Sequence, residues 1–274
     1  MVLERGISSL PCQKHGEAQQ QASDTMKKRT PRGGADSRQR GRRSRREQLA
    51  ILYEDDAVIA VNKPAGLPSV PVPGSEMPSA WSLVSAQLKA NRQKAFVVHR
   101  IDRFTSGIML FAKTERDRDN LVRQFLAHTP DREYLAVIRG QLEPQEGTLV
   151  HYFRKAGMFQ KLSRANDRDA ARAELKYSVE RVLRVACLVR AALVTGLQNQ
   201  IRVQFSAVGH PVIGDRKYHP AEAEERRIDR VALHAARLGV DHPRSGKTVS
   251  LDCEPPQDFR RLVQALSNSK SPSH

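Results

Sequence analysis

The chain has 274 residues, of which 46 are Lys or Arg and 30 are Asp or Glu, so its formal net charge is +16. A balance this basic favours a polyanionic partner, either nucleic acid or an anionic membrane surface. Three scattered cysteines argue against a disulfide framework and a thiolate metal site, and no stretch is apolar enough to predict a membrane span. We therefore expect a cytoplasmic protein.

Residues 1–48 contain 12 Lys and Arg against 5 Asp and Glu and lack aliphatic periodicity after Leu10. Such a segment cannot bury enough apolar surface to order itself, so we predict a disordered basic extension. Its densest part, RQRGRRSRR, is typical of an arm that binds phosphates without reading sequence. A solvated extension with no specific role fits equally well, and a transit peptide is a third alternative that the acidic residues weaken.

From residue 49, short apolar segments alternate with turn residues, which predicts a folded domain over 49–266 and a flexible tail over 267–274. The segment ILYEDDAVIAVNKP (51–64) predicts two strands around an Asp-Asp turn. The proline-rich segment 64–78 predicts an ordered surface loop, because proline cannot donate to a sheet ladder. Ser79 then predicts the N-cap of a helix with apolar residues at helical spacing.

In the middle of the chain, HRIDRFTSG (99–107) precedes an apolar run, 108–112, that predicts a buried strand. An amphipathic pattern predicts a helix over 115–128. The basic link 154–172 predicts a hairpin or an exposed loop. Four further segments predict strands: 132–140, 147–153, 173–183 and 186–194.

The last third of the chain predicts two helices, over 200–209 and 256–267, and between them a pair of strands, VALHAARLGV (231–240) and KTVSLDC (247–253). Strands and helices do not alternate with the βαβα rhythm of a doubly wound sheet. We therefore predict an α+β fold with a mixed, mostly antiparallel central sheet flanked by helices.

One carboxylate stands out in the segment 99–107, because Asp102 lies between Arg100 and Arg103. Nearby positive charge favours the ionised carboxylate, which suits a nucleophile, a general base or an electrostatic stabiliser. A salt bridge that closes a loop onto a strand is the alternative. Phosphate-loop, dinucleotide, zinc-protease and serine-hydrolase motifs are absent from the sequence, and no second carboxylate is placed to act with Asp102.

The segment HRIDRFTSG resembles the HRLDxxTSG motif of RluA-type pseudouridine synthases. Four further blocks agree with this family in the same order, so the resemblance spans roughly residues 49–262. The blocks are VNKPAGLPSVP (61–71), REYLAVIRG (132–140), NQIRVQFSAVGHPVIGDRKY (199–218) and LHAARLGVDHPRSGKTVSLDCEPPQDF (233–259). The resemblance implies an RNA pseudouridine synthase that detaches uracil from its ribose, rotates it and rejoins it through C5, without cofactor or metal.

The resemblance also implies roles for individual residues. Asp102 matches the essential aspartate, Arg202 the basic residue that keeps it ionised, and Tyr134 the tyrosine that stacks on uracil. Arg100 matches the arginine that fills the space left by the flipped base, and Leu233 matches the apolar wall of the base pocket. We add His99, Lys63 and Arg103 as expected substrate-binding residues. For Arg103, binding of a phosphate and support of the loop are both open.

Two departures from the family pattern concern the substrate contacts. The chain reads TGLQNQIR over 195–202 where the family usually reads TGRTHQIR, and Phe104 replaces a residue that is commonly polar. These changes motivate a competing hypothesis, an RNA-binding or ribosome-assembly factor that lost catalysis. The expected partner is ribosomal or transfer RNA, and we expect a monomer that binds neither a membrane nor a metal.

Overall fold

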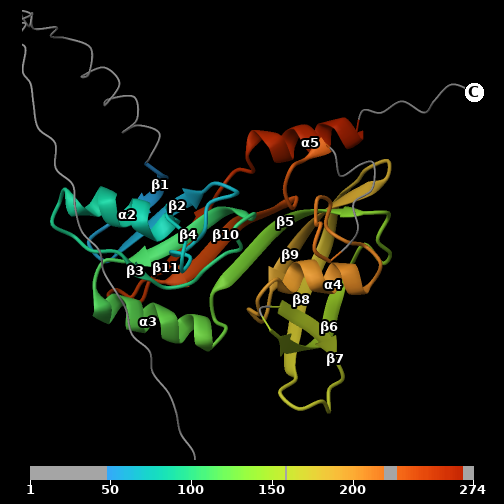
Figure 1. Ribbon diagram of the computed structural model, residues 1–274, viewed down its shortest axis with the longest axis horizontal. Helices are drawn as coiled ribbons and strands as arrows, with labels where there is room; N and C mark the ends of the chain where they lie inside the picture. Colours follow the sequence, from blue (N-terminus) through green and yellow to red (C-terminus); the bar gives the residue numbers. More distant parts are fainter. Residues whose placement is uncertain (1–47, 158, 219–226, 268–274) are drawn as a thin grey trace, which may run out of the picture. The chain divides into compact units, whose positions relative to one another are not determined.

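The computed structural model describes residues 48–157, 159–218 and 227–267, and the predictions for 1–47 and 268–274 lie outside them. The described residues form one 11-stranded sheet with helices packed against it (Figure 1). The path through the sheet is β1-β2-β4-β10-β5-β9-β8-β6-β7, with β3 paired to β4 and β11 paired to β10. In this part of the chain only β4 and β10 pair in parallel, so the predicted mixed, mostly antiparallel α+β fold is confirmed.

The strands are β1 (Ala50–Glu54), β2 (Val58–Lys63), β3 (Phe96–Val97), β4 (Ser106–Ala112), β5 (Asp131–Arg139), β6 (Glu146–Ala156), β7 (Phe159–Ser163), β8 (Ala171–Val182), β9 (Ala186–Leu193), β10 (Leu233–Asp241) and β11 (Thr248–Asp252). The helices are α2 (Ala80–Lys89), α3 (Glu115–Leu126), α4 (Gln200–Ala207) and α5 (Gln257–Ser267). Within the basic link 154–172, which we predicted to be a hairpin or an exposed loop, β7 pairs with β6. No described helix has the length and apolar content needed to cross a membrane.

Strand β4 is buried along its whole length because both of its faces are covered. Side chains alternate between the two faces of a strand. Met109 and Phe111 pack with α2 on one face, whereas Ile108 and Leu110 pack with Leu121 of α3 on the other. This double coverage explains why the sequence shows a continuous apolar run here instead of alternation.

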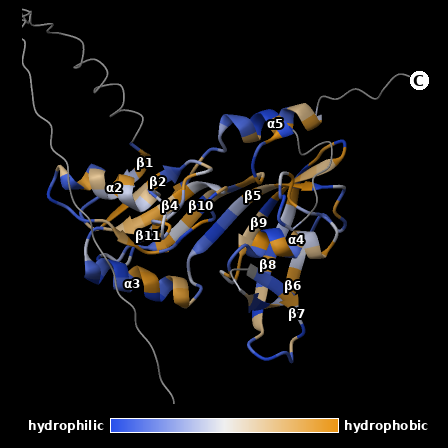
Figure 2. Cartoon of the chain, in the orientation of Figure 1, coloured by the Kyte–Doolittle hydropathy of each residue, from blue (hydrophilic) through white to orange (hydrophobic). Residues whose placement is uncertain are grey.

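The other half of the sheet carries α4 and α5, whose apolar sides join one cluster with β5, β9 and β10. Phe205 of α4 and Phe259 of α5 are the largest buried side chains that these helices contribute. Hydrophilic and hydrophobic residues share each helix, with blue and orange segments on α3 and α5 in Figure 2. Amphipathic helices of this kind bury one side and leave the other solvated.

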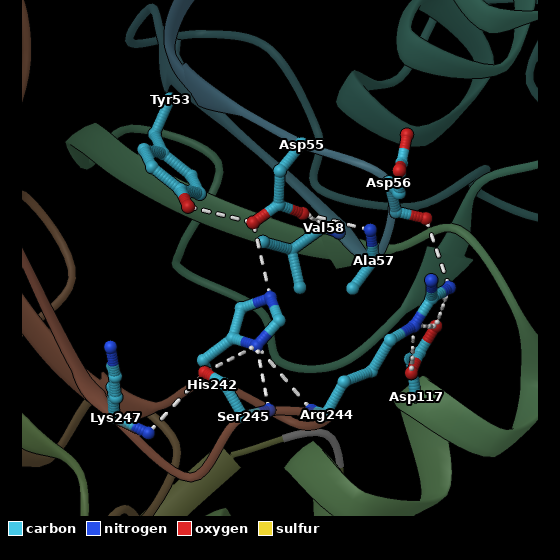
Figure 3. Close-up of polar contacts among 10 residues, drawn as sticks. All are labelled: Tyr53, Asp55, Asp56, Ala57, Val58, Asp117, His242, Arg244, Ser245 and Lys247. Atoms are coloured by element: carbon cyan, nitrogen blue, oxygen red, sulfur yellow. Dashed lines mark hydrogen bonds and ion pairs between the residues drawn. The ribbon is translucent and has the colours of Figure 1, made fainter.

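Polar contacts join the β10–β11 hairpin to the β1–β2 turn and to α3 (Figure 3). His242 Nε2 lies 3.1 Å from Asp55 Oδ2, while the other oxygen of Asp55 accepts the N–H groups of Ala57 and Val58. Arg244 donates to both carboxylate oxygens of Asp117. The hairpin is therefore tied to two elements that are distant in sequence.

Candidate active site

Asp102 lies on the loop between β3 and β4, and this loop is fixed by hydrogen bonds to the proline-rich segment. Ser69 Oγ donates to the carbonyl of Ile101 at 2.6 Å and accepts the Ile101 N–H at 3.2 Å. The Gly66 N–H donates to the Arg103 carbonyl at 2.8 Å, and the Thr105 N–H donates to the Asp102 carbonyl at 3.1 Å. The backbone on both sides of the carboxylate is thus held in place before any substrate binds.

Gly107 lets the loop enter β4 directly beside β10. Its φ is +114°, and a Cβ on this residue would lie 2.2 Å from the Ala235 carbonyl oxygen. Only glycine tolerates this conformation and this close approach. The glycine of the TSG segment therefore brings the end of the Asp102 loop against β10.

Arg202 connects Asp102 to a second, fully buried carboxylate. Its Nε and Nη2 atoms donate to the two oxygens of Asp215, each at 2.7 Å, and Nη1 donates to Asn199 Oδ1 at 2.8 Å. The same Nη1 lies 3.5 Å from Asp102 Oδ2. A guanidinium fixed by such a bidentate pair has little freedom to turn away. Arg202 therefore presents a fixed positive charge to Asp102.

Two opposing influences act on the Asp102 carboxyl. Burial raises its pKa above the ordinary aspartate value, and the positive charges of Arg202, Arg100 and Lys217 act in the opposite direction. The net direction is upward, because desolvation disfavours the charged form more than these cations favour it. Nearby positive charge thus favours the ionised form of Asp102, as we expected, but burial has the larger effect on its pKa.

A cavity of about 560 Å³ opens at Asp102. Tyr134 of β5 and Leu233 of β10 line it together with the exposed Arg100. Burial raises the pKa of Tyr134 to about 12, so its phenol is neutral near pH 7. The structure therefore brings together four of the residues selected from the sequence around one cavity, with Arg202 contacting Asp102 behind it.

His99 also lines the cavity, but as a neutral ring with structural contacts. Its Nε2 accepts the Leu110 N–H at 3.0 Å, and its ring stacks on Phe125 with centroids 4.7 Å apart. Burial lowers the pKa of His99 to about 3, and the charge of Arg132 acts in the same direction. His99 therefore supplies an uncharged wall to the cavity.

Lys63 and Arg103 do not line the cavity. Lys63 is 0% exposed, and its ammonium donates to the carbonyls of Pro64, Leu67 and Arg103 at 2.8 to 3.1 Å. Burial lowers the pKa of Lys63 to about 7. We expected a direct substrate contact, whereas in the structure all three hydrogens of the ammonium are donated to carbonyls beneath the loop.

Arg103 is exposed and supports the same loop from outside. Its Nε donates to the Gly66 carbonyl at 3.0 Å, and its guanidinium lies 5.3 Å from the centroid of the Phe104 ring. Of the two interpretations of this residue, phosphate binding or loop support, the contacts in the structure supply the second.

Sequence reasoning missed Asp215 as a site residue, although it lies in a matched block. The turn residues Ile213-Gly214 before it are the available signal, because a buried acid after a tight turn needs a cationic partner. The altered segment also has a structural role, since Asn199 accepts from Arg202 while Gln200 donates to the Glu174 carbonyl. Across the described ranges no group of three or more His, Cys, Asp or Glu side chains is arranged to hold a metal.

The sequence and the fold match a known class of enzyme. The family described as RNA pseudouridylate synthase matches residues 57–207, which is more than half of the chain, so the chain belongs to this family of RNA isomerases. A solved structure, human RNA pseudouridylate synthase domain containing 4, aligns with a TM-score of 0.66 over 79% of this chain and 92% of that one. At 21% identity this likeness supports the fold alone.

Curated relatives narrow the family to the type that the sequence suggested. Ribosomal large subunit pseudouridine synthase D of Zymomonas mobilis is 35% identical over 233 residues, covering 80% of this chain and 73% of that protein. Dual-specificity RNA pseudouridine synthase RluA of Vibrio cholerae is 35% identical over 214 residues, covering 75% and 83%. The expectation of an RluA-type pseudouridine synthase is confirmed.

Proposed function

We propose that this chain isomerises uridines in ribosomal RNA and that Asp102 is the group that acts on the target nucleoside. The observation that supports this most strongly is the Asp102 carboxylate beside Arg202, at a cavity walled by Tyr134 and Leu233. The name of a curated relative makes large-subunit ribosomal RNA the first substrate to test, and we take transfer RNA as the second. We further propose that the protein acts as a monomer in the cytoplasm.

The reaction breaks the bond between C1′ of the ribose and N1 of uracil and forms one between C1′ and C5. The proton on C5 is lost and N1 gains one, so no oxidant or reductant is needed. Asp102 either attacks C1′ or removes a proton from C2′, and both routes need the ionised carboxylate. The fixed charge of Arg202 favours that form.

The target base must leave its stack to reach Asp102, at a cost of a few kcal/mol. In the proposed complex Tyr134 stacks on the flipped uracil and Leu233 contacts its edge. Arg100 makes no hydrogen bond or ion pair with the described residues, so its guanidinium is free to enter the space that the base leaves. A planar guanidinium suits this position because it stacks on bases and binds phosphate.

The test compares ribosomal and transfer RNA from cells that express the wild type, Asp102→Asn or no protein. We expect the wild type to add pseudouridine at defined positions and Asp102→Asn to lose at least 1,000-fold in single-turnover rate, roughly the loss expected when a group essential to the chemistry is removed. RNA binding by Asp102→Asn should stay intact, because the variant removes no positive charge.

The competing hypothesis of a binding factor predicts a different outcome. If RNA from all three cell types carries the same pseudouridines and the purified wild type binds but does not modify RNA, the proposal fails. The contact of Asn199 argues against that outcome, since an altered residue still accepts a hydrogen bond from Arg202.

A further inference from the structure

Arg132 is a buried cation in the cavity that the reaction described above does not use. It precedes Tyr134 by two residues on β5, so both side chains project from the same face of the strand, about 7 Å apart along it. Arg132 is 9% exposed and lines the cavity together with Phe125 and Gly196.

The guanidinium of Arg132 is poorly satisfied within the protein. Nη2 reaches the carbonyls of Leu193 and Val194 only at 3.5 Å each, and the buried Nε has no hydrogen-bond partner. No carboxylate lies within ion-pair distance of Arg132 in the described ranges. A buried charge without a counter-ion is costly, so the site is incomplete as it stands.

The neighbours of Arg132 position its charge without neutralising it. The guanidinium carbon lies 5.8 Å from the centroid of the Phe125 ring, and its Nη1 occupies the space where a Cβ of residue 196 would stand, 2.5 Å away. Burial lowers the pKa of Arg132 below its usual value. Gly196 therefore makes room for a guanidinium that remains available to an anion.

We propose that Arg132 binds a backbone phosphate of the RNA beside the target nucleotide, a subsite that rests on the proposed function. A phosphate would supply both the missing negative charge and oxygen acceptors for Nε and the terminal nitrogens. A uracil carbonyl would accept a hydrogen bond but leave the buried charge unbalanced. The spacing along β5 places this phosphate close to a base stacked on Tyr134.

The salt dependence of RNA binding distinguishes a phosphate contact from other roles. Ribosomal RNA from cells lacking the protein is titrated with the full chain over a series of KCl concentrations. For Arg132→Gln we expect roughly a tenfold rise in Kd, as for loss of one charged hydrogen-bonding group. The slope of log K against log salt should become shallower by about 0.7 to 0.9, the value for one phosphate.

Two further variants separate charge from structure. Arg132→Lys keeps the charge and should keep the wild-type slope. Gly196→Ala keeps the guanidinium but displaces its end, and because the clash is with a flexible side-chain tip the backbone need not move. We expect Gly196→Ala to weaken binding about as much as Arg132→Gln, with no additional loss in the double variant.

Arg237→Gln is the matched control, because it removes one positive charge from β10 outside the cavity and should leave the slope unchanged. A wild-type slope for Arg132→Gln overturns the inference, whether or not Kd rises. If Arg132→Gln does not fold, wild-type affinity of Gly196→Ala overturns it. Pseudouridine formation is measured separately, so a failure of the phosphate site can be distinguished from a failure of the proposed function.

Discussion

Asp102 and Asp215 contact the same guanidinium but differ in what surrounds them. Asp215 is 0% exposed and accepts from two nitrogens of Arg202 and from the N–H groups of Lys217 and Tyr218. Asp102 faces the cavity and receives only the remaining edge of Arg202 at 3.5 Å. One carboxylate thus orients the arginine, while the other keeps oxygen lone pairs available for the reaction.

The raised pKa of Asp102 predicts the acid side of the pH profile. Because the ionised form is required, activity should fall with decreasing pH around a pKa above the ordinary aspartate value of about 3.9. Arg100→Gln removes a cation that lowers this pKa, so its acid limb should move to higher pH. The measurement is kcat/KM against pH, which reports groups of the free enzyme.

Arg103→Gln is the control for this shift, because Arg103 carries the same charge one residue from Asp102 but is not among the cations that lower its pKa most. Its acid limb should coincide with that of the wild type. Equal limbs for Arg100→Gln and the wild type would contradict the electrostatic role that we assign to Arg100.

At the next larger scale, the β10–β11 hairpin is linked to α3 by a carboxylate that also accepts a hydrogen bond from the N-cap residue of that helix. Asp117 accepts from the Thr114 hydroxyl at 2.6 Å, and its own N–H donates to Thr114 Oγ1. Arg244 reaches the same carboxylate from the hairpin at 2.7 Å (Figure 3). The hydrogen bonds from Arg244 hold the pKa of Asp117 below its usual value, against the effect of burial.

Asp117→Asn should lower the free energy of unfolding by about 1 to 2 kcal/mol at pH 7, since a buried, charge-assisted acceptor is lost while its partner remains half-exposed. A carboxyl with a lowered folded-state pKa stabilises the protein above its unfolded pKa and loses that contribution as pH falls through the folded value. The deficit should therefore be complete at neutral pH and shrink below about pH 4. Denaturant unfolding at several pH values measures it.

Asp119→Asn is the matched comparison on the same helix. Asp119 is exposed and pairs with its neighbour Arg118 at 2.7 Å. Surface pairs of this kind contribute about 0 to 1 kcal/mol, so this variant should stay close to the wild type. Equal losses in the two variants would mean that the link from Arg244 to Asp117 adds nothing to stability.

For the molecule as a whole, local patterns were sufficient to predict the parts of the fold that bury apolar residues. The run 108–112 predicts β4, and it is continuously apolar because both faces of that strand are covered. Ser79 predicts the start of α2, where its side chain accepts the Ser82 N–H. The resemblance assigned Asp102, Tyr134 and Leu233, which lie in three different blocks of the sequence, to one site. In the structure they line one cavity, which no single block indicated.

Contacts between polar groups distant in sequence could not be predicted in the same way. Lys63 reads as an ordinary residue at the end of a strand, yet three carbonyls from two segments converge on its ammonium. The pair of Arg202 and Asp215 spans 13 residues and depends on a turn between α4 and β10. No sequence pattern marks Arg132, because what distinguishes it is that its buried Nε has no hydrogen-bond partner among the described residues.

The basic extension is tested on the complete chain. Deleting residues 1–48 removes 12 Lys and Arg, so we expect weaker RNA binding and a shallower salt dependence. Single-turnover pseudouridine formation at saturating protein should be unaffected, because the described cavity lies entirely within 98–233. An unchanged salt slope would show that the extension has no part in binding RNA.

The double coverage of β4 also bears on how the enzyme fails when heated. Segments buried on both faces and hydrogen-bonded to strands on both sides exchange their amide hydrogens last, through global opening rather than local fluctuation. The Asp102 loop leads into such a segment, with β2 and β10 on either side of it. Catalytic inactivation should therefore coincide with cooperative melting of the sheet, with no earlier step in which the reactive carboxylate is lost while the rest stays folded.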